Sequence, residues 1–301
     1  MEIPKPLAAI IVNPASGRGQ SEAVGVAIDE YASSLGYTTA LRVPSSKEEA
    51  ILVTTRLAKE SDRVVVVGGD GMAHLGFNAC AQQEAVLGVV PTGTGNDFAR
   101  ALGIPADPSA AIKVAFGPVR SIGGVKASDA SGNSVWVATV ATAGFSVAVN
   151  NRASKMIRPK GSSKYTLASV QESVKLGTWK ADYTVDGKRH RKDVLMIAVA
   201  NTSTFGGGMK IAPDADPFSD KLSLVVIEKT NRRTFLRLLP KVFSGAHVHH
   251  PAVTTMHATS LELNLYRSEV LQEVQADGEK LETVMTKFEL VPNVVKLACN
   301  N

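Results

Sequence analysis

Three glycine-rich loops carry the residues best suited to hold a phosphorylated ligand. They run from Asn13 to Gly19, from Gly68 to Gly71 and from Pro91 to Asp97, and two of them contain an aspartate. Glycine lets the backbone approach a phosphate closely, and N–H groups at a helix start point toward an anion. Three such loops in one chain therefore predict a phosphate-binding site.

The spacing inside these loops differs from that of two common nucleotide motifs. None has two glycines followed by Lys and Ser or Thr, as in a P-loop, and none places GxGxxG after the first strand with an acid about twenty residues on. A dehydrogenase is therefore disfavoured. The candidate nucleotide contacts are Asn13, Pro14, Ser16, Gly17, Gly68, Gly69, Gly71, Met72, Thr92, Gly93, Thr94, Asn96 and Asp97.

The elements that must position these loops alternate between strand and helix. Predicted strands lie at Leu7–Val12, Thr38–Val43, Arg63–Val67 and Val86–Val90, and predicted helices at Ser21–Leu35, Lys47–Lys59, Gly71–Ala81 and Asn96–Leu102. Such alternation predicts a parallel sheet covered by helices. All three loops then emerge at the carboxyl edge of that sheet, where ligands bind.

The pattern changes after about Val119. Predicted strands become dominant and are separated by turn residues, which indicates an antiparallel β-rich domain. Helices are expected only at Lys164–Lys175 and Thr234–Phe243. We therefore predict an α/β nucleotide-binding domain over residues 1–120 and a β-sandwich domain over residues 121–301. The last strand, at about 287–301, is expected to return to the first domain.

Composition narrows the class of protein. The chain has 301 residues, a net charge of +5 and 44% hydrophobic residues, which suffice for ordinary buried cores. Its two cysteines, Cys80 and Cys299, are far apart, which excludes a disulfide scaffold and a cysteine metal site. The N-terminus does not resemble a signal peptide, so a cytoplasmic protein is expected. The uncharged segment Ala130–Asn151 is interpreted as two buried strands and a turn.

The glycine loops and several later motifs resemble one known family. The segments Val67–Gly71 and Pro91–Arg100 are similar to the catalytic domain of the diacylglycerol kinases, especially the soluble bacterial lipid kinases. Further matches follow in the expected order, at Gly206–Met209, Asp220–Leu222 and Asp277–Glu279. The resemblance spans about residues 8 to 297 and implies a nucleotide-binding α/β domain followed by a β-sandwich.

This resemblance implies roles for individual residues. Asp70 would organise the phosphates of ATP and the catalytic Mg²⁺, although an aspartate there would also suit a helix N-cap. Glu279 would be the general base, although Asp-Gly-Glu alone is typical of a surface hairpin turn. Asp220, with the carbonyl oxygens of Pro217 and Leu222, would hold a structural Mg²⁺, since oxygen ligands suit that ion. An ordinary turn before a strand would explain the same residues.

One position departs from the family pattern. Met72 stands where the family usually has Thr after Gly-Gly-Asp-Gly, so a hydroxyl that could contact a phosphate is missing. The backbone N–H groups remain, and altered nucleotide contacts are expected without loss of activity. Elsewhere, His247, His249 and His250 lack a nearby cysteine and are interpreted as a polar turn, which is favoured over a zinc site.

The expected function is transfer of the γ-phosphate of ATP to a lipid hydroxyl. Diacylglycerol is the favoured acceptor, and phosphatidylglycerol, a sphingoid base or another lipid alcohol remain alternatives. An enzyme like NAD kinase, acting on a soluble metabolite, is less favoured because of Asn96–Arg100 and Asp277–Glu279. A nucleotide sensor without catalysis is disfavoured, because the carboxylates of Asp70, Asp97 and Glu279 are all present.

A run of basic residues bears on the partners of the protein. Arg152, Lys155, Arg158, Lys160 and Lys164 have no acid between them and suit anionic lipid headgroups, or simply a solvated face. No nucleic-acid-binding motif is present, so nucleic acid is not expected. We expect a cytoplasmic enzyme that associates peripherally with membranes, with an isologous homodimer as a reasonable assembly.

Overall fold

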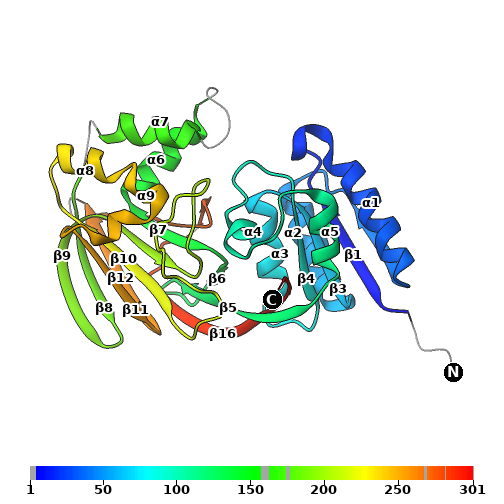
Figure 1. Ribbon diagram of the computed structural model, residues 1–301. Helices are drawn as coiled ribbons and strands as arrows, with labels where there is room; N and C mark the ends of the chain where they lie inside the picture. Colours follow the sequence, from blue (N-terminus) through cyan, green and yellow to red (C-terminus); the bar gives the residue numbers. More distant parts are fainter. Residues whose placement is uncertain (1–4, 157–162, 174–176, 268–269, 282, 301) are drawn as a thin grey trace. The chain divides into compact units, whose positions relative to one another are not determined.

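The computed structural model describes residues 5–156, 163–173, 177–267, 270–281 and 283–300 (Figure 1). Two compact units are present: Met1–Ile122 with Asn293–Asn301, and Gly123–Pro292. The chain passes from one unit to the other in β5 (Val119–Ser128) and again in β16 (Lys287–Ala298). We call them the first and the second unit.

The first unit contains a parallel sheet built from apolar runs. Its strands are β1 (Leu7–Val12), β2 (Thr38–Arg42), β3 (Arg63–Gly68) and β4 (Val86–Pro91). They lie in the order β4-β3-β1-β2, and every pair is parallel. Every residue of β3 is buried, as expected for a strand covered on both faces.

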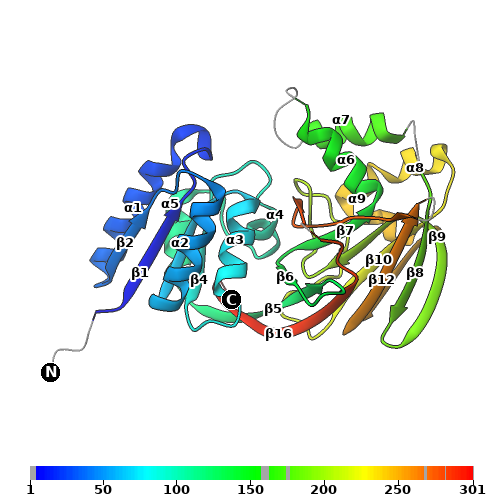
Figure 2. The same cartoon turned by 180° about the vertical axis from the view of Figure 1, so that it is seen from behind.

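Helices cover this sheet. They are α1 (Ser21–Ser34), α2 (Lys47–Glu60), α3 (Asp70–Cys80), α4 (Asp97–Ala101) and α5 (Pro108–Ala115). Ser46 caps α2 by accepting a hydrogen bond from the N–H of Glu49, and Asp107 caps α5 in the same way. Helix α1 packs beside α5, and α2 beside α3 (Figure 2).

The second unit is dominated by antiparallel strands. Its sheet has the order β15-β14-β7-β9-β8-β12-β16, and β10 joins β9 to β11. The strands are β6 (Ser134–Val137), β7 (Val140–Gly144), β8 (Trp179–Val185), β9 (Lys188–Ala200), β10 (Leu222–Glu228), β11 (Val253–Ala258), β12 (Ser260–Arg267), β13 (Val270–Leu271), β14 (Val274–Ala276) and β15 (Glu279–Lys280). The last strand, β16, pairs with β12 in this unit and with β4 in the first.

Helices gather on one side of the second unit (Figure 1). They are α6 (Phe145–Ser154), α7 (Ser163–Glu172), α8 (Arg232–Leu238) and α9 (Lys241–Ser244), and we call them the helical layer. Phe145 of α6 contacts Phe235 of α8 edge-on, with ring centroids 4.6 Å apart. Within the described part of the chain, no helix is long and apolar enough to cross a membrane.

The structure differs from three local predictions for the second unit. Two strands form in Ala130–Asn151 as expected, but the segment also contains most of α6, from Phe145 onward, where no helix was predicted. The single helix expected at Thr234–Phe243 is divided into α8 and α9 around Pro240, which lacks a backbone donor. His247 lies in a short 3-10 turn, Ala246–His249, as expected, but its side chain is fully buried and bonds to the carbonyl of Ile211 at 3.0 Å.

Candidate active site

The three glycine loops lie side by side at the carboxyl edge of the parallel sheet. They follow β1, β3 and β4, which are neighbours in the sheet. Backbone hydrogen bonds join them at their bases, from Asn13 N to Val67 O (3.0 Å) and from Thr92 N to Gly68 O (2.9 Å). The sheet therefore brings together the loop residues that the sequence singled out.

Close backbone contacts explain why glycine is required in these loops. A Cβ atom on Gly93 would lie 2.5 Å from the Cα of Gly69, closer than real Cβ atoms approach. Gly17 has a φ of +61° and lies against Ser21 and Thr92. The second and third loops therefore pack against one another through their backbones.

Three hydroxyl groups connect the first loop with the third. Ser16 Oγ lies 2.8 Å from Ser21 Oγ and 2.9 Å from Thr92 Oγ1, and Ser21 donates to Thr92 Oγ1 at 3.1 Å. Ser21 is completely buried and was not among the predicted site residues. Because their hydroxyls bond to one another, Ser16 and Thr92 have a clear structural role in fixing the two loops.

Asn13 shapes the start of the first loop, and Met72 packs on the second. The Oδ1 atom of Asn13 accepts a hydrogen bond from the N–H of Ala15 at 2.9 Å, and its carbonyl accepts one from Ser16 Oγ at 2.8 Å. Pro14 follows on the exposed side of this turn. The Met72 side chain is 7% exposed and packs directly over Gly68. At this position the chain thus has an apolar side chain packed on the backbone of its own loop.

Asp70 is the central carboxylate of the loops. Its Oδ1 atom accepts hydrogen bonds from the N–H groups of Asp97 (2.6 Å) and Phe98 (3.4 Å), so it caps α4, whereas Gly69 is the N-cap of its own helix α3. Burial, followed by the negative charge of Asp97, raises the pKa of Asp70 from 3.8 to about 6. The carboxylates of Asp70 and Asp97 are therefore close enough to repel one another.

Asn96 offers an acceptor to a ligand. It has a left-handed backbone with φ +52°, and its Nδ2 donates to the carbonyl of Gly93 at 2.9 Å. Its buried Oδ1 atom has no hydrogen-bond partner among the described residues. A buried acceptor without a partner is costly, and a ligand donor or a metal ion would satisfy it. Gly71 and Thr94 lie nearby in the same loops and are exposed.

Glu279 stands on a tightly held hairpin turn of the second unit. Asp277 and Gly278 have positive φ values of 52° and 80° and reverse the chain between β14 and β15. Asp277 Oδ1 accepts hydrogen bonds from the N–H (2.7 Å) and the hydroxyl of Thr139 and from the N–H of Val140, and Oδ2 accepts from the N–H of Ala138. Asp277 therefore anchors the turn that carries Glu279.

Helix α6 holds the other side of the same turn. Asn150 Nδ2 donates to the carbonyl of Gly278 at 2.8 Å and to Oε1 of Gln275 at 2.7 Å. Gln275 is 3% exposed, while Glu279 is half-buried. A carboxylate on a turn fixed from two sides has a defined direction, which suits a group that must meet a reacting proton.

The segment predicted to bind a structural metal is an ordered turn before β10. Asp220 is exposed, whereas Pro217 and Leu222 are buried. The carbonyl of Pro217 accepts a hydrogen bond from the N–H of Gly123 at 2.8 Å. In the described ranges, no group of three or more His, Cys, Asp or Glu side chains could hold a metal ion. Asp220 would thus be the single charged ligand, completed by carbonyl oxygens.

Comparisons with known proteins agree along nearly the whole chain. Residues 7–126 match the profile of the diacylglycerol kinase catalytic domain, and residues 139–299 match the YegS C-terminal NAD kinase beta sandwich-like domain. The chain is 32% identical over 249 residues to a diacylglycerol kinase of Mycobacterium tuberculosis (strain CDC 1551 / Oshkosh), covering 82% of this chain and 79% of that one.

The chain belongs to the diacylglycerol kinase family. A diacylglycerol kinase of Bacillus subtilis (strain 168) is 29% identical over 280 residues, covering 90% of this chain and 89% of that one. The resemblance inferred from the motifs is confirmed, and this diacylglycerol kinase family member is a lipid kinase enzyme.

Solved structures share the fold of this diacylglycerol kinase family member. Three from Bacillus anthracis str. Sterne give TM-scores of 0.80, 0.79 and 0.74 at 21%, 20% and 18% identity. Each covers 99% of this chain and 98% or 99% of the other. The predicted fold class, an α/β domain with a β-sandwich-like domain, is confirmed.

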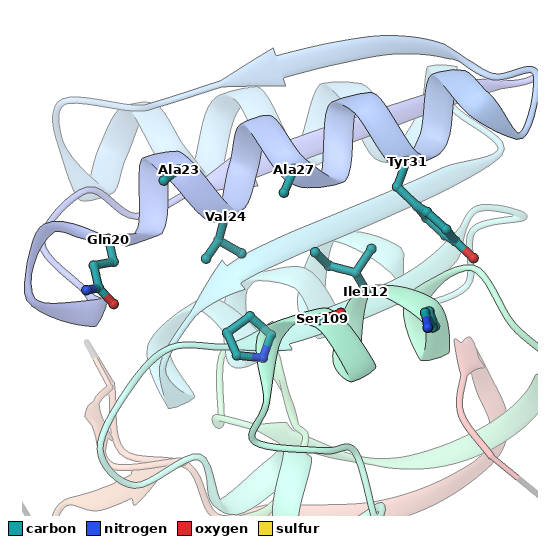
Figure 3. Close-up of a pocket in the computed structure, with 9 residues that line it drawn as sticks. Gln20, Ala23, Val24, Ala27, Tyr31, Ser109 and Ile112 are labelled. Atoms are coloured by element: carbon teal, nitrogen blue, oxygen red, sulfur yellow. The ribbon is translucent and has the colours of Figure 1, made fainter.

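A groove of the first unit begins at Gln20, directly after the first glycine loop. It has a volume of about 580 Å³ and runs between α1 and α5 (Figure 3). Apolar side chains dominate its lining, which consists of Gln20, Ala23, Val24, Ala27, Tyr31, Pro108, Ser109, Ile112 and Lys113. This lining includes none of the predicted site residues.

Proposed function

We propose that the protein transfers the γ-phosphate of ATP to the hydroxyl of diacylglycerol and so forms phosphatidic acid. The observation that carries this proposal is the packing of three glycine loops at one edge of the parallel sheet, with Asp70 hydrogen-bonded to the third loop, in a chain of the diacylglycerol kinase family. The relatives reported above are named diacylglycerol kinases, which favours diacylglycerol over other lipid alcohols.

The phosphates of ATP would be bound by the backbone of the glycine loops. N–H groups of Gly17, Gly69, Gly71 and Gly93 would face the phosphate oxygens, because no side chain there prevents close approach. The start of α3, at Asp70, adds the positive end of a helix dipole. Met72 contributes packing only, so the missing threonine hydroxyl would alter nucleotide contacts while leaving this backbone cradle intact.

The residues around Asp70 fit a magnesium ion. The carboxylates of Asp70 and Asp97 and the amide oxygen of Asn96 are hard oxygen donors, and that amide oxygen lacks a protein partner in the described residues. A divalent cation would also offset the repulsion that raises the pKa of Asp70. When bound, Mg²⁺ neutralises charge on the phosphoryl oxygens.

Glu279 would receive the proton of the acceptor hydroxyl. As the proton leaves, that oxygen attacks the γ-phosphorus, and the bond to the β-phosphate oxygen breaks to release ADP. Asp277 and Asn150 would act as positioning residues, because they hold the turn but their bonds are directed at backbone and amide groups. The turn before β10, with Asp220, Pro217 and Leu222, would hold a second, structural Mg²⁺.

The acceptor can be identified by offering a panel of alcohols with labelled ATP. Diacylglycerol, phosphatidylglycerol, a sphingoid base and NAD would each be tested in turn, and the products separated by thin-layer chromatography. We expect the strongest labelled product from diacylglycerol. A dominant product from another lipid would move the proposal to that acceptor, and labelling of NAD alone would contradict lipid phosphorylation.

The proposed acceptor sets where the enzyme works. Diacylglycerol resides in membranes, so a cytoplasmic enzyme that associates peripherally and reversibly with the bilayer is proposed. The basic run expected to meet lipid is only partly described: Arg158 and Lys160 lie outside the described residues. Arg152 forms an ion pair with Glu172. Lys155 is exposed. We also propose an isologous homodimer, which size-exclusion chromatography with light scattering would test.

A further inference from the structure

Helices α8 and α9 carry an unusual distribution of charge. From Lys229 to Leu261 the chain contains no aspartate or glutamate, but it contains five lysines and arginines. Lys229 is held 3.8 Å from Asp193. The other four, Arg232, Arg233, Arg237 and Lys241, are exposed and form no ion pair within the part of the chain that the structure describes. This segment therefore presents uncompensated positive charge.

Apolar side chains are exposed among these cations. Leu236 is 37% exposed on α8, and Phe243 is 44% exposed on α9. On α8, Leu236 follows Arg232 by four positions and Arg233 by three, so the three side chains lie on one face of the helix. Phe235 and Leu238 occupy the opposite face and are buried. The outward face of α8 thus combines cations with an apolar side chain.

The surrounding helices share this character. All the large apolar side chains described as exposed in the second unit lie in the helical layer, at Leu167, Val170, Leu236 and Phe243. The sequences of α6 to α9 contain a single acid, Glu172, and Arg152 neutralises it. Strands β8 and β9 also carry more cations than acids, but Arg189 pairs there with Asp182 and Lys192 with Glu228. None of the large apolar side chains described in these two strands is exposed.

We infer that the face formed by Arg232, Arg233, Leu236, Arg237, Lys241 and Phe243, which we call the α8–α9 surface, docks on an anionic lipid bilayer. Cations would meet lipid phosphates while Leu236 and Phe243 enter the headgroup region, as interfacial helices do. Nucleic acid or an acidic protein could also bind the cations, but neither partner would explain why apolar side chains are exposed between them. The inference deepens the proposed function and rests on it, since a lipid acceptor must be reached at a bilayer.

The α8–α9 surface is physically connected to the turn of Glu279. Phe235 of α8 packs on Phe145 of α6, and Asn150 of α6 holds the carbonyl of Gly278. All four of these residues lie in the second unit, and both phenylalanine side chains are buried. A bilayer on this surface would therefore lie against the elements that position the candidate base.

Vesicle binding with matched charge variants tests this inference. The triple variant Arg232→Gln, Arg233→Gln and Arg237→Gln would be compared with a control, Lys180→Gln, Lys188→Gln and Arg191→Gln, which loses the same charge from exposed positions on β8 and β9. Phosphatidylcholine vesicles with or without phosphatidylserine would be sedimented with each protein, in the absence of ATP. We expect the triple variant to bind anionic vesicles about a hundredfold more weakly, at about 1 kcal/mol per charge, and the control to bind nearly as the parent does.

A fluorescent probe reports whether the surface enters the headgroup region. Cys80 and Cys299 are buried, at 0% and 1% exposure, so a Leu236→Cys variant can be labelled selectively with an environment-sensitive dye. Its emission should shift to the blue on anionic vesicles, whereas a dye on a Lys188→Cys variant should not respond. Equal weakening of both triple variants, or a silent probe at position 236, would overturn the inference.

A separate assay distinguishes this inference from the proposed function. Phosphorylation of a short-chain diacylglycerol in neutral detergent micelles needs no anionic surface, so the Arg232, Arg233 and Arg237 variant should keep the parent rate there. If the parent phosphorylates no lipid but the variant still loses vesicle binding, the proposed function fails and the docking surface stands. If the parent is active and the variant binds vesicles normally, the docking surface is wrong.

Discussion

At the scale of single residues, Asp70 combines burial with an acidic neighbour. Its pKa, raised to about 6 from 3.8, means that the folded protein binds this proton more tightly than the unfolded chain does. The free energy of unfolding therefore falls as the pH rises from 3.8 through 6, because the folded protein must then give up this proton. At pH 7 the loss is fully present. A bound cation would offset the repulsion between Asp70 and Asp97 that contributes to this loss.

Replacing Asp70 with asparagine should accordingly stabilise the protein in the absence of Mg²⁺. Asparagine keeps an oxygen that can accept from the N–H of Asp97 but removes the charge. At pH 7 we expect a gain of about 1–2 kcal/mol, discounted from the full value of the shift because the residue retains some solvent contact. Denaturant unfolding at several pH values measures it. The difference should shrink as pH falls toward 4, and a gain independent of pH would refute this explanation.

Glu279 is the residue on which the proposed chemistry most depends. Glu279→Gln keeps the size of the side chain and the turn held by Asp277, but it cannot accept a proton. We expect kcat for lipid phosphorylation to fall by about 10²–10⁴-fold, with unchanged thermal unfolding. The neighbouring Lys280→Gln variant is the control, since Lys280 is exposed and its ion pair with Glu273 is a surface one. Near-parental turnover of Glu279→Gln would remove Glu279 from the mechanism.

At the scale of elements, the turn before β10 raises the question of a second ion. Asp220 is exposed and heads β10, next to the carbonyl groups of Pro217 and Leu222. If these oxygens hold Mg²⁺, Asp220→Ala should raise the magnesium concentration needed for half-maximal activity. Asp214→Ala, at another exposed acid of the same connection, should leave the titration unchanged. An identical titration for parent and Asp220→Ala would exclude the second ion while leaving the site at Asp70 untouched.

Elements were predicted well from the sequence where local pattern decides them. The buried run of β3 predicted a strand covered on both faces, because strand burial is encoded in the local pattern. The glycines after β1, β3 and β4 marked one edge of the parallel sheet, because each follows a strand directly. The split between α8 and α9 was missed, although Pro240 could have indicated it. The burial of His247 had no such signal, because its partner Ile211 lies 36 residues away.

Within the candidate site, the residues that were missed act through distant partners. Ser21 was overlooked because its hydroxyl bonds to Thr92, 71 residues along the chain. Asp277 was noted as part of a motif, but its anchoring of Thr139 spans 138 residues and depends on the folded sheet. The roles of Asp70 and Glu279 in catalysis stay predictions, because their geometry supports those roles without testing them.

At the scale of the whole molecule, the return of β16 decides how the first unit is completed. The predicted boundary near residue 120 stays a prediction, and β16 offers a way to test it. Lys296 and Leu297 of β16 pair in parallel with Val86 and Leu87 of β4. Val294 accepts a hydrogen bond from the N–H of Gln82, which ties the C-terminal strand to the nucleotide-binding unit.

Leu297→Ala should therefore destabilise the first unit although it lies near the C-terminus. Leu297 is fully buried, and we expect a loss of about 2–4 kcal/mol, as for other large-to-small core substitutions. Hydrogen exchange should reveal the loss in β3 and β4. Lys296→Ala is the control, because it removes only a surface ion pair with Glu84. Unchanged protection in β3 and β4 would mean that β16 does not support this unit.

The central claim is that the γ-phosphate of ATP is transferred to a lipid hydroxyl. It is tested most directly by incubating the protein with Mg²⁺, diacylglycerol and ATP labelled at either the γ- or the α-phosphate, and by counting label in the organic extract. The account predicts label in the extract from γ-labelled ATP only, and at least a hundredfold less of it with Asp70→Asn, about the size of effect that loss of an electrostatic catalytic group produces. Extracts without label from γ-labelled ATP, or with equal label for Asp70→Asn and the parent, would contradict it.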